Sequence, residues 1–240
     1  MSKTKLLIID SQHAVGSTTN PNDFTVNINN QYLDNVKKVS LVGLRTINSV
    51  YNVNAGNNVI DYISGVAKQV VVPVGQYTAT DFINAVNAAQ TDFTLFLNPL
   101  TFKFEWASVG APITIVKTDI SSELIGLTSD LVDAVGGVTL VSQLTPDLSG
   151  LSIIYVSSSA LGHSHSILSN SVNSNIISAV GVNSPFGAPI YYVSDTRDES
   201  DNHKYESHQT ITKIDIQLLN HNYKPCQLQS NCHLIFKVYY

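Results

Sequence analysis

The sequence predicts an all-β fold, a single eight-stranded jelly roll with a small inserted α/β unit. Short apolar runs broken by Asn, Gly, Ser and Pro recur along most of the 240 residues, which is the spacing of a β-sandwich. About eight of these runs lie outside residues 75–148, the number needed for two four-stranded sheets. Inside residues 75–148 a helical stripe replaces the alternating pattern, so this segment is expected to be an insertion domain.

The N-terminal segment, residues 1–22, is expected to be an arm. Its apolar residues are Leu6, Leu7, Ile8 and Ile9, and a polar stretch that contains Gly and Pro follows them. That stretch places the apolar run poorly for joining the core of its own subunit. We therefore expect these four residues to form an assembly arm that packs against a neighbouring subunit.

Residues 23–74 are expected to form the first part of the jelly roll. Phe24–Ile28 alternates apolar with polar residues, as a strand with one solvated face does. Val36–Ile47 has apolar residues at both parities and predicts a longer, more fully buried strand. Asn57–Ile63 and Lys68–Val74, which a Ser-Gly pair joins, predict a hairpin.

Residues 75–148 are expected to fold as the insertion. Phe82, Ile83, Val86 and Ala89 share one stripe of a helix, for which Thr80 or Asp81 is the expected N-cap. Three strands and a short second helix follow in the order Phe93–Leu97, Thr101–Trp106, Ile113–Lys117 and Ser121–Gly126.

Residues 149–240 are expected to complete the jelly roll. The predicted strands are Leu151–Ser157, Ile176–Val182, Thr210–Leu218 and His233–Tyr240. The segments Ser158–Asn175 and Pro185–His208 between them are polar and are expected to be long loops. Long loops in a compact fold usually carry function or contacts.

The composition favours a surface that other proteins cover. Charged residues make up 13% of the chain, where about a quarter is usual, and Ser, Asn and Thr replace them. A polar but weakly charged surface is desolvated at low cost. The net charge of -5 disfavours bulk nucleic-acid binding, and no run approaches the ~20 apolar residues of a membrane span. Cys226 and Cys232 lie close together in the sequence, and buried free thiols are favoured over the alternative, a disulfide between them.

The sequence offers few candidates for chemistry, and no cofactor is expected. His163 and His165 form an H-x-H pair, but without further spaced ligands a solvated loop is favoured over a metal site. Asp195–Asp201 is rich in carboxylates but lacks the spacing of a calcium loop, so a solvated loop is favoured again. No nucleophile elbow, phosphate-binding loop, paired carboxylates or catalytic triad is present, so an enzyme is not expected.

One aromatic strand leaves two alternatives open. Phe102, Phe104 and Trp106 alternate along it, and this pattern fits a ligand platform for stacking a sugar or a base. Packing against the insertion's own helix is the commoner use. Exposure of Trp106 discriminates between the two.

Several segments together carry a resemblance to a known family. They are Ser17–Val26, Val72–Thr78 leading into the helix with Phe82 and Asn87, Phe102–Phe104, Leu124–Leu127, Ser152–Ser157, Ile214–Asn220 and the final apolar strand. On these segments the chain resembles the penton, or vertex capsid, proteins of virophages, Polinton-like viruses and related large double-stranded DNA viruses. The chain has Leu127 where that family commonly has an aromatic residue.

The resemblance implies a single jelly roll with an outward-facing insertion, five copies of which close an icosahedral vertex. The implied partners are its own copies in a homopentamer, the major capsid protein of the same particle, and a host receptor through the insertion. The implied location is the virion vertex, after synthesis in the host cytoplasm. Two alternatives stay open: another minor capsid protein, and a carbohydrate- or receptor-binding jelly roll of spike or lectin type.

Overall fold

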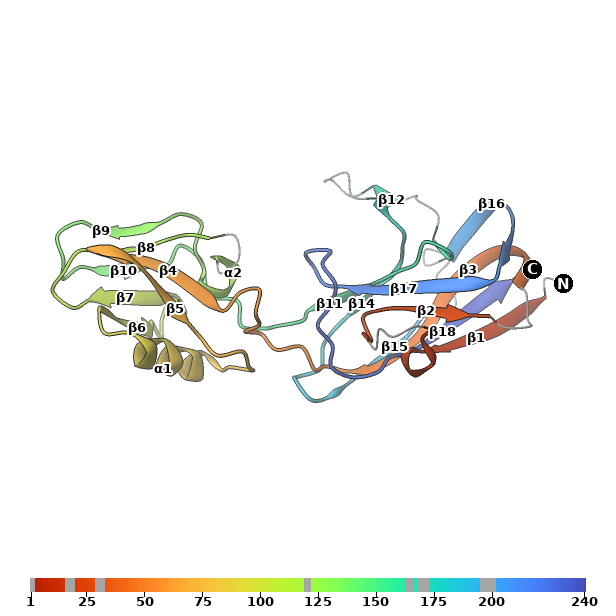
Figure 1. Cartoon of the computed structure of the whole chain (residues 1–240), viewed down its shortest axis with the longest axis horizontal. Coiled ribbons are helices and arrows are strands. Elements are labelled where there is room, and N and C mark those ends of the chain that lie inside the picture. The colour runs from red at the N-terminus through yellow and green to blue at the C-terminus, as the bar shows by residue number, and fades with distance from the viewer. Residues whose placement is uncertain are drawn as a thin grey trace. The chain divides into compact units, whose positions relative to one another are not determined.

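The protein is mostly β and divides into two compact units. The computed structural model describes residues 3–15, 20–28, 33–118, 122–162, 166–167, 173–194 and 202–240. Unit 1 comprises Met1–Val50 and Leu151–Tyr240, and unit 2 comprises Tyr51–Gly150 (Figure 1). Each unit has its own hydrophobic core and its own antiparallel sheets.

Unit 1 contains two larger sheets. The five-stranded sheet has the order β1 (Thr4–Asp10), β18 (His233–Tyr239), β3 (Leu33–Ile47) and β15 (Pro189–Val193), and β16 (Asn202–Ile211) also pairs with β3. The four-stranded sheet has the order β14 (Ile176–Gly181), β11 (Ile153–Ser157), β17 (Lys213–Leu219) and β2 (Asp23–Asn27). A short 3₁₀ turn, Ser11–His13, and a small pair of strands, β12 (Ser166–Ile167) and β13 (Asn173–Ser174), complete the unit.

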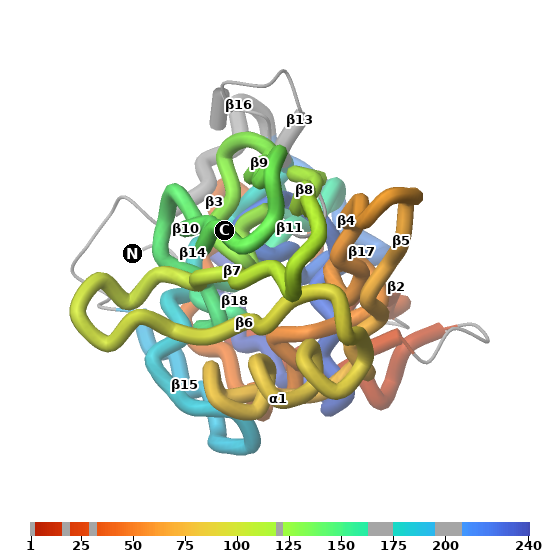
Figure 2. Tube along the Cα trace, turned by 90° about the vertical axis from the view of Figure 1, so that its left-hand side faces the viewer, coloured from red at the N-terminus to blue at the C-terminus, as the bar shows by residue number. Residues whose placement is uncertain are grey.

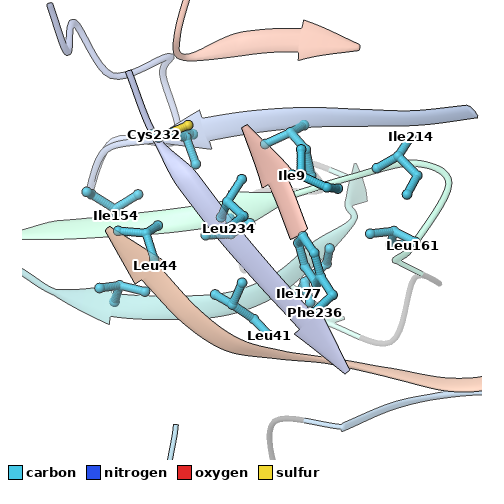
Figure 3. Close-up of a cluster of buried hydrophobic side chains, with 14 of the residues drawn as sticks. Ile9, Leu41, Leu44, Ile154, Leu161, Ile177, Ile214, Cys232, Leu234 and Phe236 are labelled. Atoms are coloured by element: carbon cyan, nitrogen blue, oxygen red, sulfur yellow. The ribbon is translucent and has the colours of Figure 1, made fainter. Parts of the chain in front are cut away.

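Strict alternation along the strands builds the core of unit 1. In β18, Leu234, Phe236 and Val238 are fully buried while the residues between them are not. Figure 3 shows Leu234 and Phe236 from one sheet in a single cluster with Ile154, Ile177 and Ile214 from the other. Side chains on a strand alternate between its faces, so every second residue reaches the core.

Unit 2 is built from two small sheets and two helices. One sheet has the order β5 (Val66–Val71), β4 (Val59–Ser64), β8 (Ile113–Ile115) and β9 (Leu131–Asp133). The other has the order β10 (Thr139–Val141), β7 (Phe104–Ser108) and β6 (Phe93–Leu97). The helices are α1 (Ala79–Ala89), which lies against β6 (Figure 2), and α2 (Ser122–Ile125). None of the helices in the described residues is long and apolar enough to cross a membrane.

Helix α1 forms where the sequence predicted it, but its cap lies two residues earlier. Thr78, not Thr80 or Asp81, is the N-cap, and its hydroxyl accepts a hydrogen bond from the Asp81 backbone N–H at 3.2 Å. The same hydroxyl donates to the Asp81 carboxylate at 2.7 Å. Asp81 therefore serves the first turn of the helix, where a negative charge is favourable.

The expectation of an N-terminal arm is wrong for residues 4–10. This segment is β1, which pairs with β18 along its whole length, from Thr4 opposite Tyr239 to Asp10 opposite His233. Ile9 is buried in the core of unit 1 and Leu7 packs against that core, whereas Leu6 and Ile8 are exposed. The long C-terminal strand supplies a pairing partner that is distant in sequence, and the local pattern does not reveal it.

The expected boundary of the insertion at residue 75 is also wrong. The hairpin of β4 and β5 was assigned to the jelly roll, but it belongs to unit 2, which begins at Tyr51. Ile60 and Val70 of this hairpin pack with Phe82 of α1 in the core of unit 2. The strands of a hairpin alternate apolar and polar residues in the same way whichever unit they belong to. The sequence pattern therefore does not decide which core the hairpin joins.

The segment Pro185–His208, expected to be a loop, contains two strands. β15 pairs with Gly43–Ile47 of β3, and the backbone of β16 pairs with the part of β3 before it, Leu33–Ser40. The two strands thus fill successive parts of the same edge of β3. The apolar run within Pro189–Val193 is a strand signal that the polar composition around it obscures.

Candidate interaction surfaces

The first surface is the free edge of β1, which carries the four residues of the predicted assembly arm. Leu6 is 66% exposed and Ile8 is 69% exposed, and both lie on the face of the sheet opposite the core. Among the described strands, only β18 pairs with β1. The outer edge of β1 therefore offers backbone groups and two large apolar side chains together.

Backbone hydrogen bonds identify which β1 residues face that edge. The Ser11 N–H donates to the Cys232 carbonyl at 3.0 Å, and the Tyr240 N–H donates to the Lys3 carbonyl at 3.0 Å. Bonded pairs alternate with non-bonded pairs in an antiparallel ladder, and the register of β1 with β18 is unbroken. The backbone groups of Leu6 and Ile8 therefore point away from β18.

The second surface is the opposite edge of the same sheet, at β15. The Asn48 N–H donates to the Ala188 carbonyl at 2.9 Å, and the Ser194 N–H donates to the Val42 carbonyl at 3.1 Å. By the same alternation, the backbone groups of Tyr191 and Val193 point away from β3. Their side chains are 63% and 82% exposed.

A hollow of about 730 Å³ lies beside the β15 edge. Its wall includes Arg45, Ile47, Pro189, Tyr191 and His233. The Arg45 guanidinium lies 5.4 Å from the centre of the Tyr191 ring, so a cation is held at this edge. The lining of the hollow mixes apolar and polar side chains, and Arg45 adds a positive charge.

The predicted ligand platform on the aromatic strand is wrong. Trp106 and Phe104 are fully buried, and Phe104 stacks on Phe82 of α1 with ring centres 5.7 Å apart. The Trp106 indole N–H donates to the Ser142 hydroxyl at 3.3 Å inside the core. Phe102 lies before the strand in the turn, with a φ of 54° and 62% exposure. The three aromatic side chains thus share no open face.

The turn that contains Phe102 is held rigidly. The Asn98 side-chain oxygen accepts hydrogen bonds from the backbone N–H groups of Leu100 and Thr101, and the Phe102 N–H donates to the Asn98 carbonyl. Leu100 is 89% exposed at the tip. An Asn that bonds its own turn is the usual reason for such a fixed conformation.

Two carboxylates with lowered pKa values stabilise unit 2 rather than form a reactive site. Asp92 accepts hydrogen bonds from Lys68 at 2.8 Å and from the Tyr62 hydroxyl at 2.7 Å, and these bonds lower its pKa. Burial, assisted by the bond to Asp92, raises the pKa of Tyr62 to about 12. For Asp133, burial raises the pKa, but hydrogen bonds from Val138, Gly136, Ser108 and Val135 outweigh burial and lower it. Asp133 thus braces the turn at residues 135–138, and Asp92 links its own segment to β4 and β5.

Cys226 and Cys232 are free thiols buried in unit 1. Burial raises the pKa of each to about 12, so both stay protonated at neutral pH. Since the thiolate is the reactive form, neither cysteine is suited to redox chemistry or metal binding.

The remaining chemical candidates lie outside the described residues. These are the pair His163 and His165 and the acidic run Asp195–Asp201. In the part of the chain that the structure describes, no three His, Cys, Asp or Glu side chains gather in a way that could hold a metal ion.

Comparisons with known proteins give a likeness in fold. No protein-family model matches the sequence, and no curated protein matches it. Among solved structures, the fold matches the crystal structure of the selenomethionine-labelled mavirus penton protein, with a TM-score of 0.53 and 12% sequence identity. The match covers 99% of this chain and 99% of that chain. The chain therefore has a penton-like fold over its whole length.

Sequence reasoning found one of the two exposed edges and missed the other. It singled out Leu6 and Ile8, although it assigned them to an arm rather than to a strand. It missed Tyr191 and Val193 because they lie in a segment whose composition predicts a loop. The alternation of Ile190 and Tyr192, which face inward, with Tyr191 and Val193 was the available signal.

Proposed function

We propose that this chain is a structural, non-enzymatic capsid protein that forms the pentameric vertex of an icosahedral virus particle. The single observation that carries the proposal is the likeness in fold to the mavirus penton protein, which extends over 99% of both chains. A match of this extent includes unit 2 as well as unit 1, so it concerns the whole architecture and not a widespread sandwich alone.

We propose that unit 1 is a jelly roll and that unit 2 is an insertion domain within it. The sheet orders β1-β18-β3-β15 and β2-β17-β11-β14 support this, because each sheet joins strands that precede unit 2 in the chain to strands that follow it. When β15 and β16 count as one position, the sheets hold eight strands, the number of a jelly roll. In chain order, unit 2 is inserted between β3 and β11.

The composition supports assembly as the role of unit 1. Only 13% of the residues are charged, so a large part of the surface can be covered by neighbours at low desolvation cost. The proposed neighbours are four further copies of the chain and the major capsid protein of the same particle, and the proposed location is the virion vertex. The alternative is a minor capsid protein with the same fold, which would assemble with a symmetry other than fivefold.

A host receptor is the partner we propose for unit 2. Its rigid turn exposes Leu100 and Phe102, and a second turn braced by Asp133 exposes Val135 at 81%. Fixed turns with apolar tips lose little conformational entropy on binding. The lectin alternative is not favoured, because Trp106 is buried.

Electron microscopy of the full-length chain under assembly conditions tests the proposed function. Class averages viewed along the symmetry axis are expected to show closed rings of five subunits. Rings with another number of subunits would leave a minor capsid role in place of the vertex, and isolated subunits under every condition would overturn the proposal.

A further inference from the structure

The two edges of the five-stranded sheet are complementary to each other. β1 and β15 lie at opposite edges of one sheet in which every neighbouring pair of strands is antiparallel. β1 therefore runs opposite to β15, and β1 of one copy placed beside β15 of another makes a further antiparallel pair. Such an addition continues the sheet from one subunit into the next.

The backbone groups of the two edges are also in phase. Leu6 and Ile8 direct their backbone groups outward at one edge, and Tyr191 and Val193 do so at the other. In each pair the residues are two apart, which is the repeat of hydrogen-bonded pairs in an antiparallel ladder. A register that places Leu6 opposite Val193 and Ile8 opposite Tyr191 thus lets the outward backbone N–H and C=O groups of the two edges bond each other.

The side chains support the same pairing. All four are more than 60% exposed and lie on the sheet face away from the core, so the pairing brings apolar side chains together on one face. The next residue on that face of β1, Asp10, then falls beside Pro189, at the hollow that holds the Arg45 guanidinium. The Asp10 carboxylate accepts a hydrogen bond from the Gln12 N–H and lies 3.2 Å from the His233 ring nitrogen of its own subunit, so the pairing would add the Arg45 charge to an acidic group that is already braced.

The other sheet of unit 1 provides an internal comparison. Its edge strands, β2 and β14, present no exposed large apolar side chain. Protein edges are commonly protected by charge, proline or a bulge. Between Thr4 and Asp10 the outward face of β1 has none of these, and its register with β18 is unbroken.

We propose that copies of this chain associate head to tail, with the β1 edge of one subunit pairing with the β15 edge of the next, Leu6 opposite Val193 and Ile8 opposite Tyr191. The occupant of each edge is a second copy of this chain. The contact joins two different surfaces, which is the kind of interface that closes a ring with an odd number of subunits. This inference rests on the proposed pentamer and assigns its interface.

Disulfide trapping in the assembled full-length chain tests the register. Hydrogen-bonded antiparallel pairs have Cα atoms about 5.5 Å apart, within the range that a disulfide spans. The double variant Leu6→Cys/Val193→Cys is expected to give, after oxidation, a ladder of covalent oligomers that reductant collapses. Mixing the two single variants should give covalent dimers only. The native cysteines are buried and contribute no background.

A matched pair of variants on the other sheet serves as the control. Thr25→Cys/Ala179→Cys places thiols on β2 and β14, the opposite edges of the four-stranded sheet, and should give no ladder. A ladder from this control and none from the Leu6/Val193 pair would overturn the proposal. In a second measurement, Ile8→Lys and Val193→Pro are each expected to abolish assembly, whereas Ala179→Lys on β14 leaves assembly intact.

The outcomes separate this proposal from the proposed function. If the unmodified chain forms pentamers while Ile8→Lys and Val193→Pro still assemble and no ladder forms, the edge pairing is wrong and the vertex role stands. If the unmodified chain never assembles, both are wrong. If the edge variants remain monomeric with unchanged melting temperatures, and the ladder forms, the pairing is established.

Discussion

At the residue scale, burial decides the role of Trp106. It is the only tryptophan of the chain, it is fully buried, and it contacts Phe93 and Phe104 in the core of unit 2. Trp106→Ala is expected to destabilise unit 2 by about 3–5 kcal/mol, because truncation leaves a cavity. Urea unfolding measures this, with Phe102→Ala in the exposed turn as a control that should change stability by less than about 0.5 kcal/mol. Equal effects of the two variants would contradict the buried role.

The hydrogen bonds to the Asp92 carboxylate predict that the stability of unit 2 depends on pH. They lower the pKa of the folded carboxyl below the ~3.9 of an unfolded Asp, so the stabilisation is present above about pH 4. As the pH falls through the folded pKa, protonation removes that stabilisation. The difference in melting temperature between the native chain and Asp92→Asn should therefore shrink between pH 6 and pH 3. A Lys68→Met variant should reduce the dependence, and a constant difference at all pH values would contradict it.

At the element scale, strand β1 contains both a residue that stabilises the fold and residues that are exposed on the surface. Ile9 is 2% exposed, and Ile9→Ala is expected to cost about 2–5 kcal/mol of stability. Leu6→Ala should leave stability nearly unchanged, because that side chain is already exposed. Denaturant unfolding of both variants checks this. If Ile9→Ala proved as mild as Leu6→Ala, the segment would be an arm after all.

The assignment of the β4–β5 hairpin to unit 2 predicts how fragments behave. Asn52 closes unit 2, since its side-chain amide donates to the carbonyls of Tyr77 and Leu148 at 2.8 and 2.9 Å. A fragment of residues 51–150 is therefore expected to unfold cooperatively. A fragment of residues 75–148 lacks the hairpin and Asn52, and should remain unfolded. Circular dichroism melting compares them, and a cooperative transition in the shorter fragment would contradict the boundary.

The elements also show what could be predicted from the sequence. The strand Phe93–Leu97 and the helix Ala79–Ala89 could be located from the sequence. The spacing of apolar residues and the residues that end an element depend only on neighbouring positions in the chain. The partner of each strand depends on residues far along the chain. The sequence therefore left open that Thr4–Asp10 pairs with His233–Tyr239, and that the β4–β5 hairpin packs on α1.

The candidate surfaces were less predictable than the fold. Phe104 and Trp106 have the same alternation whether their face is covered or open, so the pattern could not decide between a core and a platform. Tyr191 and Val193 become an interaction surface only because β15 ends the sheet, which is a property of the topology. Leu6 and Ile8 were recognisable because four apolar residues near a terminus stand out in any arrangement.

At the scale of the whole molecule, the chain combines a penton-like fold with a low content of charged residues and two complementary sheet edges. The fold match extends over both units, and the edges belong to unit 1 alone. The proposed head-to-tail pairing is the kind of contact that closes a ring, and five is the number of subunits that we propose for it.

Native mass spectrometry of the full-length chain tests the central claim, the homopentamer, most directly. Under assembly conditions, we expect a dominant species with five times the 26.1 kDa mass of the chain, and salt should alter its abundance but not its stoichiometry. A stable dimer, or a monomer under every condition tried, would contradict the vertex role.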